Sequence, residues 1–521
     1  MGFLSGVRTA AIGLLLSLVL PPGTARSADR PLALDEAVQM ALRKNPSLVI
    51  ERESVAAANA AASGARGAYD PLLGLSGAWS RSTEPVNSAF SGAPAGRFAP
   101  ETETTGAGAS IDQRLPSGGA LSLRAQGSRA TTDGSFALLS PAYATDLGVE
   151  LRQPLLRGLA IDPARASIRV ARAGQRQADA GLRRTVSETV AAVETAYWGL
   201  VAARQGVAVL EDAVRLAEQQ LAETRSRVQS GAAPGTELSQ PRAELERRRG
   251  DLLADREALA QAENRLKLLI LSDTDDALWQ AALAPTDTAT VAAAPLDAGA
   301  AQQRALVTRA EIEVARASLE RSRATTALAR NQVWPALDAV VSYDRFGLAG
   351  SANPLGPGGA LPANLDGQLG QSFHVLGDGD FDATRVALVL GLPVFNRDAR
   401  AAAAIARSAE RQSEADLARV RNAIRAEVRV AAAAVETAGQ RIEAARAGRE
   451  AAEVQLSAER DRFATGLSTN FLVLTRQNDL SRARLDEIAA RTDYQNARTE
   501  LARATGSLLE ERGIDAGATP R

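Results

Sequence analysis

The sequence predicts an α+β fold that is mainly α-helical and contains an internal two-fold repeat. Residues 165–266 align without a gap on residues 400–501, at a constant offset of 235. Within the first copy, apolar residues recur at alternating steps of three and four from Leu182 to Val228, which is typical of a long coiled-coil helix. Between the helical stretches, proline-bounded segments of alternating residues indicate β-strands. Because repeats bury surface against one another, the repeat determines the architecture.

Residues 1–28 have the pattern of a secretory signal peptide. A short segment with one positive charge precedes an apolar run from Thr9 to Leu20, which is too short to span a bilayer. Pro21 and Pro22 end this run before the small residues between Ala25 and Ala28, where we expect cleavage. The alternative is a short buried N-terminal helix. A signal peptide predicts that the mature chain is exported.

Composition excludes several classes of function. No other stretch has the roughly 20 uninterrupted apolar residues that a transmembrane helix needs. The chain has no cysteine, so disulfides, catalytic thiols, cysteine metal sites and a thioether-linked lipid anchor are excluded. Its net charge is −1, and its 60 basic side chains, of which only Lys44 and Lys267 are lysines, are interleaved with acids. No basic face for nucleic acid is therefore expected.

The first repeat is expected to cover residues 29–271. Its long helix would measure about 110 Å at 1.5 Å per residue. Gly231 should end it, because glycine can adopt the left-handed conformation in which the chain turns back. Two half-length helices would stack end to end to match the long one. The expected elements are a helix over 35–68, a β region over 71–154, the long helix over 155–230 and a return helix over 236–271.

The second repeat is expected to cover residues 300–506, after a linker over 272–299. Gly466 should end its long helix, as Gly231 does in the first repeat. A tail over 507–521 contains Gly, Ala and Pro without an apolar period, so we expect it to be disordered. The expected elements are a helix over 300–334, a β region over 335–393, a long helix over 394–465 and a return helix over 470–506.

Proline stands at all four crossings between helix and strand, namely at Pro71, Pro154, Pro335 and Pro393. Proline cannot donate to a sheet and disfavours helix at the residue before it, so it suits such a boundary. The few strands of one exported chain would not form a closed sheet, so the backbone groups at the sheet edges would lack hydrogen-bond partners. Unpaired backbone groups are too costly within a lipid bilayer. Closing a barrel would therefore need several copies of the chain.

The first β region is longer than the second. The turn over 115–119 lies between two alternating runs, which fits either an extra hairpin or a folded-over extracellular loop. We therefore expect four to six strands per chain. Stretches rich in Gly, Pro, Ser and Asn predict surface loops over 84–102, 131–142 and 347–380.

Four sequence marks, in order along the chain, resemble the TolC-like outer-membrane ducts, the outer membrane factor family that serves efflux pumps and type I secretion systems. Each mark is weak alone, but together they lie inside a tandem repeat behind a signal peptide and cover nearly the whole mature chain. The marks are the opening Leu32, Leu34, Ala37, Ala41, Leu42, Asn45 and Pro46, the strand exit Gln153 to Gly158, the second exit Leu392 to Phe395, and the turn Arg462 to Thr469.

The resemblance implies a homotrimer in the outer membrane that extends into the periplasm. Strands of three chains would close one transmembrane β-barrel, and their long antiparallel helices would continue it as a periplasmic α-barrel. Such ducts are passive conduits that dock on a periplasmic adaptor (a membrane fusion protein) and an inner-membrane pump. The implied partners are these proteins and outer membrane lipid, without nucleic acid. No catalytic site, cofactor or metal is implied.

The resemblance also places the functional residues at the tips of the helical hairpins. The implied docking surface for the adaptor consists of Gly231, Ala232, Gly466, Leu467 and Ser468. The implied periplasmic gate consists of Glu237, Gln240, Asn470, Leu472 and Thr475. Some relatives carry aspartates six and nine residues beyond the second tip glycine, as an acidic cation-binding ring, whereas this chain has Leu472 and Thr475 there. Glu237 could pair or repel across a threefold axis, or could simply stabilise a first helical turn.

Two other classes of function compete with the duct. A periplasmic coiled-coil adaptor or scaffold without a pore shares the heptads and the export signal, but it would not carry two hairpins interrupted by proline-bounded strands. No pattern of catalytic residues in this sequence supports an enzyme. The single histidine, His374, lies in a predicted loop with the segment 378–382, which lacks the spacing and closing glutamate of a calcium loop.

Overall fold

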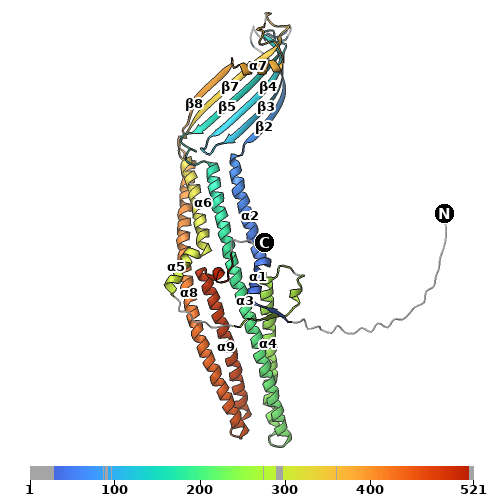
Figure 1. Ribbon diagram of the computed structural model, residues 1–521, viewed down its shortest axis with the longest axis vertical. Helices are drawn as coiled ribbons and strands as arrows, with labels where there is room; N and C mark the ends of the chain where they lie inside the picture. The colour runs from blue at the N-terminus through green and yellow to red at the C-terminus, as the bar shows by residue number, and fades with distance from the viewer. Residues whose placement is uncertain are drawn as a thin grey trace, which may run out of the picture. The chain divides into compact units, whose positions relative to one another are not determined.

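The computed structural model describes residues 29–85, 87, 92–94, 97–273, 275–288, 297–358 and 361–515 (Figure 1). The expected signal peptide over 1–28 and the end of the expected tail, 516–521, lie outside these residues, as does part of the linker over 272–299. The chain divides into two compact units. The tip unit comprises Met1–Asn45, Thr189–Ala293 and Glu436–Thr499, and the sheet unit comprises Pro46–Glu188, Ala294–Val435 and Glu500–Arg521. The described chain is mainly helical and contains an antiparallel sheet, as predicted.

The sheet unit contains six antiparallel strands side by side (Figure 1). Their order in the sheet follows the chain, so β2 and β8 form the two edges. A short helix, α7 (Leu369–Asp378), packs on β5 and β7, where the Thr145 hydroxyl donates to the Ser372 carbonyl at 3.1 Å. The strands are β2 (Leu72–Thr83), β3 (Glu101–Arg114), β4 (Ala120–Thr132), β5 (Leu139–Pro154), β7 (Ala336–Ala352) and β8 (Asp382–Gly391).

The two faces of this sheet differ in chemistry. Because side chains alternate along a strand, register partners share a face. One row across the sheet is Leu73, Ile111, Leu123, Val149 and Tyr343, and each is the partner of the next. The opposite face carries the polar alternates, including several charged side chains. One face is therefore apolar and the other polar, although neither is covered by a second sheet.

Helices of the sheet unit pack through small and branched apolar side chains. A buried cluster joins Ile312 and Leu319 of α6 to Ile424 and Val428 of α8. Alanines in the same cluster let the helices approach closely. The helices and helical parts are α2 (Pro46–Arg66), the first part of α3 (Pro163–Gln229), α5 (Ala298–Thr308), α6 (Ala310–Gln332), the first part of α8 (Arg397–Ala464) and α10 (Leu508–Glu511).

The tip unit consists of two helical hairpins and a small two-stranded sheet. Its core includes Val207, Leu210 and Leu252 from the first hairpin, with Leu485 of the second packed against them. The parallel pair β1 (Arg30–Leu32) and β6 (Leu283–Pro285) lies beside the buried Tyr197. The helices are α1 (Leu34–Lys44), the second part of α3, α4 (Ser239–Ile270), the second part of α8 and α9 (Asn470–Thr505) up to Thr499, with 3₁₀ turns η2 (Gly235–Leu238) and η3 (Ala277–Trp279).

The helix expected over 35–68 is wrong in its continuity, because the structure has α1 and α2 separated at Asn45. Asn45 has the extended conformation (φ −64°, ψ 123°), which Pro46 imposes on the residue before it. The helix expected over 300–334 is likewise divided into α5 and α6 at Arg309 (φ −67°, ψ 125°). No proline explains this second break. The buried Arg309 guanidinium instead pairs with Glu311 and Glu427.

Three further boundaries differ from the expectation. The helix expected from residue 155 begins at Pro163, because Gly158 turns the chain in the left-handed region (φ +91°). The loop expected over 347–380 contains the end of β7 and α7, so His374 lies on a helix. Part of the expected tail forms α10, with Leu508 buried. The turn over 115–119 joins β3 to β4 as a hairpin.

Among the described residues, no helix has the length and apolar character needed to cross a bilayer.

Candidate functional site

The long helices α3 and α8 end in the same local structure at the tips of the two hairpins. Gly231 and Gly466 adopt left-handed φ values of +78° and +79°. In the first tip Ala232 N donates to the Arg227 carbonyl at 2.8 Å, and in the second Leu467 N donates to the Arg462 carbonyl at 2.8 Å. These bonds close Schellman motifs, which satisfy the last carbonyls of a helix and reverse the chain.

The two tips differ after their glycines. The first continues through Pro234 and the exposed turn η2 before α4 begins, whereas the second enters α9 almost directly at Asn470. In the second tip the Ser468 hydroxyl is bonded to the carboxylate of Glu459, which is buried in α8. This bond holds the second turn against its own helix. The Leu467 side chain is 80% exposed beside it, as an apolar group available for contact.

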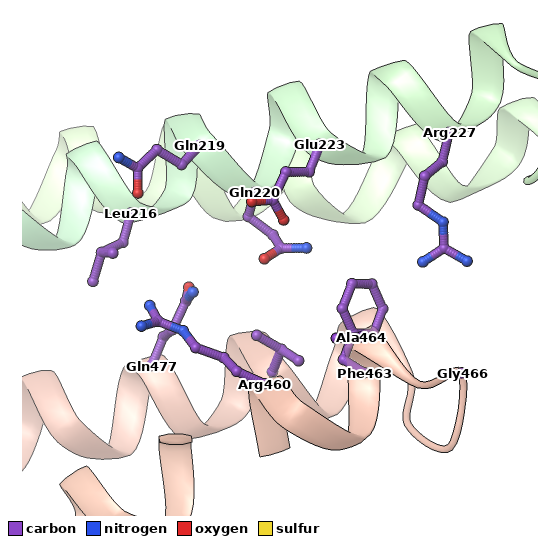
Figure 2. Close-up of a pocket in the computed structure, with 11 residues that line it drawn as sticks. Leu216, Gln219, Gln220, Glu223, Arg227, Arg460, Phe463, Ala464, Gly466 and Gln477 are labelled. Carbon is purple, nitrogen blue, oxygen red and sulfur yellow. The ribbon is translucent and has the colours of Figure 1, made fainter. Parts of the chain in front are cut away.

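A groove of about 700 Å³ lies between α3 and the end of the second hairpin (Figure 2). The guanidinium of Arg227 on α3 lies 5.1 Å from the ring centre of Phe463 on α8. A cation over an aromatic face at this distance is attracted by the ring. The residues that line the groove are Leu216, Gln219, Gln220, Glu223 and Arg227 from α3, Arg460, Phe463 and Ala464 from α8, Gly466 from the tip, and Val473 and Gln477 from α9.

The contact between α3 and α9 beside this groove is incompletely hydrogen-bonded. Thr224 is buried, and its hydroxyl donates to the Gln220 carbonyl at 2.9 Å. Asn470 Nδ2 reaches the Thr224 hydroxyl at 3.5 Å, which is a long contact. Among the described atoms, Gln220 Nε2 and Asn470 Oδ1 are buried without a hydrogen-bond partner. A buried polar group without a partner costs about 1–3 kcal/mol, so the contact between these two helices is polar rather than part of the apolar core.

The structure distributes the expected gate residues around the tips. Glu237 is exposed in η2 and Gln240 is exposed at the start of α4. Leu472 is 38% exposed, and the Thr475 hydroxyl donates to the Phe471 carbonyl of its own helix at 2.9 Å. Asn470 is the member of this set that contacts α3. Glu237, Gln240, Leu472 and Thr475 do not line the groove.

The expected docking residues lie in the two turns. Gly231, Ala232, Gly466 and Leu467 are exposed and Ser468 is half-buried. Sequence reasoning missed Arg227, Phe463 and Thr224, which connect the two hairpins. The repeat aligns Arg227 with Arg462 and not with Phe463, so it gave no signal for this contact.

The rest of the tip unit contains a second buried polar centre. The hydroxyl of Tyr197 donates to Asp287 at 2.6 Å and lies 2.9 Å from the Leu32 carbonyl, and it accepts from Thr286 N and Asp287 N. Burial, together with the bond to Asp287, raises the pKa of Tyr197 to about 12. This centre joins α3 to both strands of the small sheet. No group of three or more His, Cys, Asp or Glu in the described ranges is arranged to hold a metal ion.

Residues 121–270 and 301–507 match the model of the family described as outer membrane efflux protein, which is more than half of the chain. The chain belongs to the outer membrane efflux protein family. The resemblance to TolC-like outer-membrane ducts is thereby confirmed. This family consists of efflux proteins of the outer membrane and is not an enzyme family. No curated protein matches the sequence significantly.

Solved structures of this kind are similar in fold. The Campylobacter jejuni CmeC outer membrane channel is 15% identical, with 92% of this chain and 90% of that chain covered and a TM-score of 0.63. The outer membrane protein VceC of Vibrio cholerae is 17% identical, with 91% and 96% covered and a TM-score of 0.63. The Neisseria gonorrhoeae MtrE outer membrane channel is 17% identical, with 91% and 89% covered and a TM-score of 0.60. These three structures share the fold along most of the chain.

Proposed function

We propose that this protein is the outer membrane channel of a tripartite efflux pump, a passive homotrimeric conduit from the periplasm to the exterior. The observation that carries the proposal is the open sheet of the sheet unit. It has two unpaired edges, β2 and β8, and an apolar face whose side chains are largely exposed, such as Leu75 at 77% and Leu388 at 70%. An exposed apolar sheet with open edges is not a stable end state in water or in lipid.

Association of copies resolves both problems. Six antiparallel strands alternate in direction, so β2 of one copy and β8 of the next run antiparallel and can pair. A closed ring of sheets has no edge, which is the condition for strands to span a bilayer. The apolar face then contacts lipid, except where α7 covers it over β5 and β7. The polar face, where Arg124 lies 2.8 Å from both Asp146 and Asp344, lines the lumen.

The tips of the helical hairpins are the proposed periplasmic end. The two turns expose Leu467 and contain two left-handed glycines. The proposed surface on which the adaptor docks consists of Gly231, Ala232, Gly466, Leu467 and Ser468. Glu237, Gln240, Asn470, Leu472 and Thr475 form the gate. The junction between α3 and α9 has unsatisfied buried amides, which lowers the free energy needed to separate the hairpins. CmeC and MtrE are each described as an outer membrane channel, and a shared fold supports the same role here.

The experiment is single-channel recording of the detergent-purified mature protein in planar bilayers, with chemical crosslinking to count chains. Discrete, long-lived pores from a trimer are expected. A monomer or dimer without pores would favour the alternative, a periplasmic scaffold. Identifying the inner-membrane protein that copurifies distinguishes efflux from type I secretion. An efflux pump and a secretion transporter differ in sequence and in the cargo they transport.

A further inference from the structure

The hairpin formed by β3 and β4 is inserted within the sheet, between β2 and β5. All twelve residues of β2 are register partners of β3, from Leu72 opposite Asp112 to Thr83 opposite Glu101. On its other side, β4 pairs with β5 from Ala120 opposite Arg152 to Ala130 opposite Ala142. β2 and β5 are not neighbours in the sheet. The hairpin therefore adds two full-length strands to each copy.

The hairpin continues the chemistry of both faces. On the apolar face, Ile111 and Leu123 are partners of each other and stand between Leu73 of β2 and Val149 of β5. On the polar face, the Ser122 hydroxyl donates to Asp112 at 2.6 Å, within the hairpin. A loop folded over the barrel would have no reason to keep this alternation in register with its neighbours.

One side chain of the hairpin ties it to strands on both halves of the chain. Arg124 of β4 donates from Nε to Asp146 of β5 and from Nη2 to Asp344 of β7, each at 2.8 Å. These ion pairs cross two strand boundaries on the polar face. They hold β4 in the plane of the sheet, since displacing the hairpin would leave both aspartates without this partner.

We propose that the hairpin enlarges the pore, so that three copies close an 18-stranded barrel with a wide, water-filled lumen. This rests on the proposed homotrimer. Strands spaced 4.8 Å apart and tilted by about 40° give a barrel about 36 Å across between opposite backbones, against about 24 Å if each copy supplied four strands. Barrels of 16–18 strands leave an aqueous channel, whereas small barrels are filled by their side chains.

The lumen side of the hairpin suits a wide exit. Its polar-face residues are mostly small, including Thr104, Gly108, Ser110, Ser122 and Ser128, so few side chains project into the channel. The barrel therefore does not select cargo by size up to at least the width of an α-helix, about 10–12 Å. Size selection lies at the helical tips, and the exit accepts bulky polar molecules and polypeptide as well as small solutes.

The direct test is electron cryomicroscopy of the full-length protein in lipid nanodiscs, with the strands counted in cross-section. Eighteen strands around a threefold axis are the expected result. A pore-forming trimer with twelve strands, in which β2 pairs with β5 and the hairpin lies outside the wall, overturns this proposal while leaving the conduit intact. A protein that does not trimerise overturns both.

A second test uses the absence of cysteine in the chain. Leu75→Cys with Ala109→Cys places thiols on register partners of β2 and β3 and should form an intrachain disulfide on mild oxidation. The control pairs Leu75→Cys with Ala125→Cys of β4, one strand further away, and should stay reduced. Lack of crosslinking in the first pair overturns the proposal.

A third test removes residues 101–132. The loops on either side of the hairpin lie at the same end of the sheet, so β2 can then connect to β5 as a simple hairpin. The radius of the largest polyethylene glycol that enters from the sheet side should fall by at least about 1.5-fold, because the backbone diameter falls by that factor and side chains occupy an equally thick layer in both barrels. An unchanged cut-off in a trimeric variant contradicts the proposal, and the disulfide test decides the matter if this variant does not fold.

Discussion

The guanidinium of Arg227, near the end of α3, lies 5.1 Å from the ring centre of Phe463, near the end of α8. These two residues are 236 positions apart in the sequence, yet they face each other across the groove between the two hairpins (Figure 2). The contact connects the tips at the place where the proposed conduit must open. Under the proposed function, this contact is a latch between the two hairpins that opening must release.

Replacing Phe463 by Ala should favour the open state. A cation–π contact at an exposed site contributes about 0.5–1 kcal/mol, so the ratio of open to closed channels should rise about two- to fivefold per copy. Open probability in planar bilayers is the measurement. Phe471→Ala removes a nearby aromatic side chain that does not line the groove and should leave gating unchanged. Equal effects of the two substitutions would argue against the latch.

Replacing Gly231 by Ala should destabilise the first tip by about 1–2 kcal/mol, because an L side chain in the left-handed region is strained. No atom lies within 4 Å of the added Cβ, so the cost comes from the backbone conformation alone. Amide hydrogen exchange over residues 225–240 should accelerate. Gly235 also has open space around a Cβ but no left-handed φ, so Gly235→Ala is the matched control. Similar exchange in both variants would show that the Schellman turn contributes little.

Stability should fall as the pH rises through the titration of Tyr197. Burial and the bond to Asp287 raise its folded-state pKa to about 12 from 10.0. A raised pKa means that the stabilisation is complete below pH 10 and is lost between pH 10 and about 12. The melting temperature, followed between pH 8 and 12, should drop less steeply for Tyr197→Phe than for the parent chain. Tyr69→Phe should keep the parental slope.

For Glu311 in the sheet unit, we expect stability to fall as the pH decreases. Burial alone would raise its pKa, but the hydrogen bonds and charge of Arg309 outweigh burial and hold the pKa below 4.5. A lowered pKa gives stability that is present above pH 4.5 and is lost as the pH falls further. Glu311→Gln should flatten the acid limb of the unfolding curve. Glu313→Gln alters an exposed pair with Arg316, so its acid limb should match that of the parent chain.

Lys267 should not tolerate replacement by Arg. Its ammonium is bonded to the carbonyls of Trp279 and Ala281 at 2.9 and 2.7 Å and paired with Glu263 at 2.8 Å, and the residue is 3% exposed. A planar guanidinium cannot reproduce three bonds from one compact centre.

Thermal unfolding is the measurement for this substitution. Lys267→Met should lose about 3–5 kcal/mol, since Glu263 would remain as a half-buried unpaired charge. Lys267→Arg should also be clearly destabilised. Lys44→Arg changes the partly exposed pair with Asp276 and should cost little. A stable Lys267→Arg variant would show that charge alone matters at this position.

Local features were predictable where a short stretch of sequence determines the structure. The apolar period from Leu182 to Val228 lies within α3, and the glycines at 231 and 466 mark where both long helices turn back. Alternation on either side of the turn over 115–119 allowed a hairpin, which the structure contains as β3 and β4. In each case the conformation depends on residues close together in the chain.

Features that depend on distant contacts were not predictable. The break at Arg309 coincides with its ion pair to Glu427, more than a hundred residues away. The helix α7 forms against β5 and β7, so its loop-like composition was misleading. The groove residues Arg227 and Phe463 meet only because two hairpins pack together, and no local pattern announces that packing.

The most direct test of the conduit is whether three copies close a ring through β2 and β8. The natural chain has no cysteine, so the double variant Leu75→Cys, Leu388→Cys has one thiol on each edge strand, both on the apolar face. A flexible bis-maleimide can then join the thiols of neighbouring copies. A closed ring of three copies should give a covalent ladder that ends at the trimer, with no larger species and no ladder from either single variant. A chain that stays monomeric, or a ladder that continues beyond three, would contradict it.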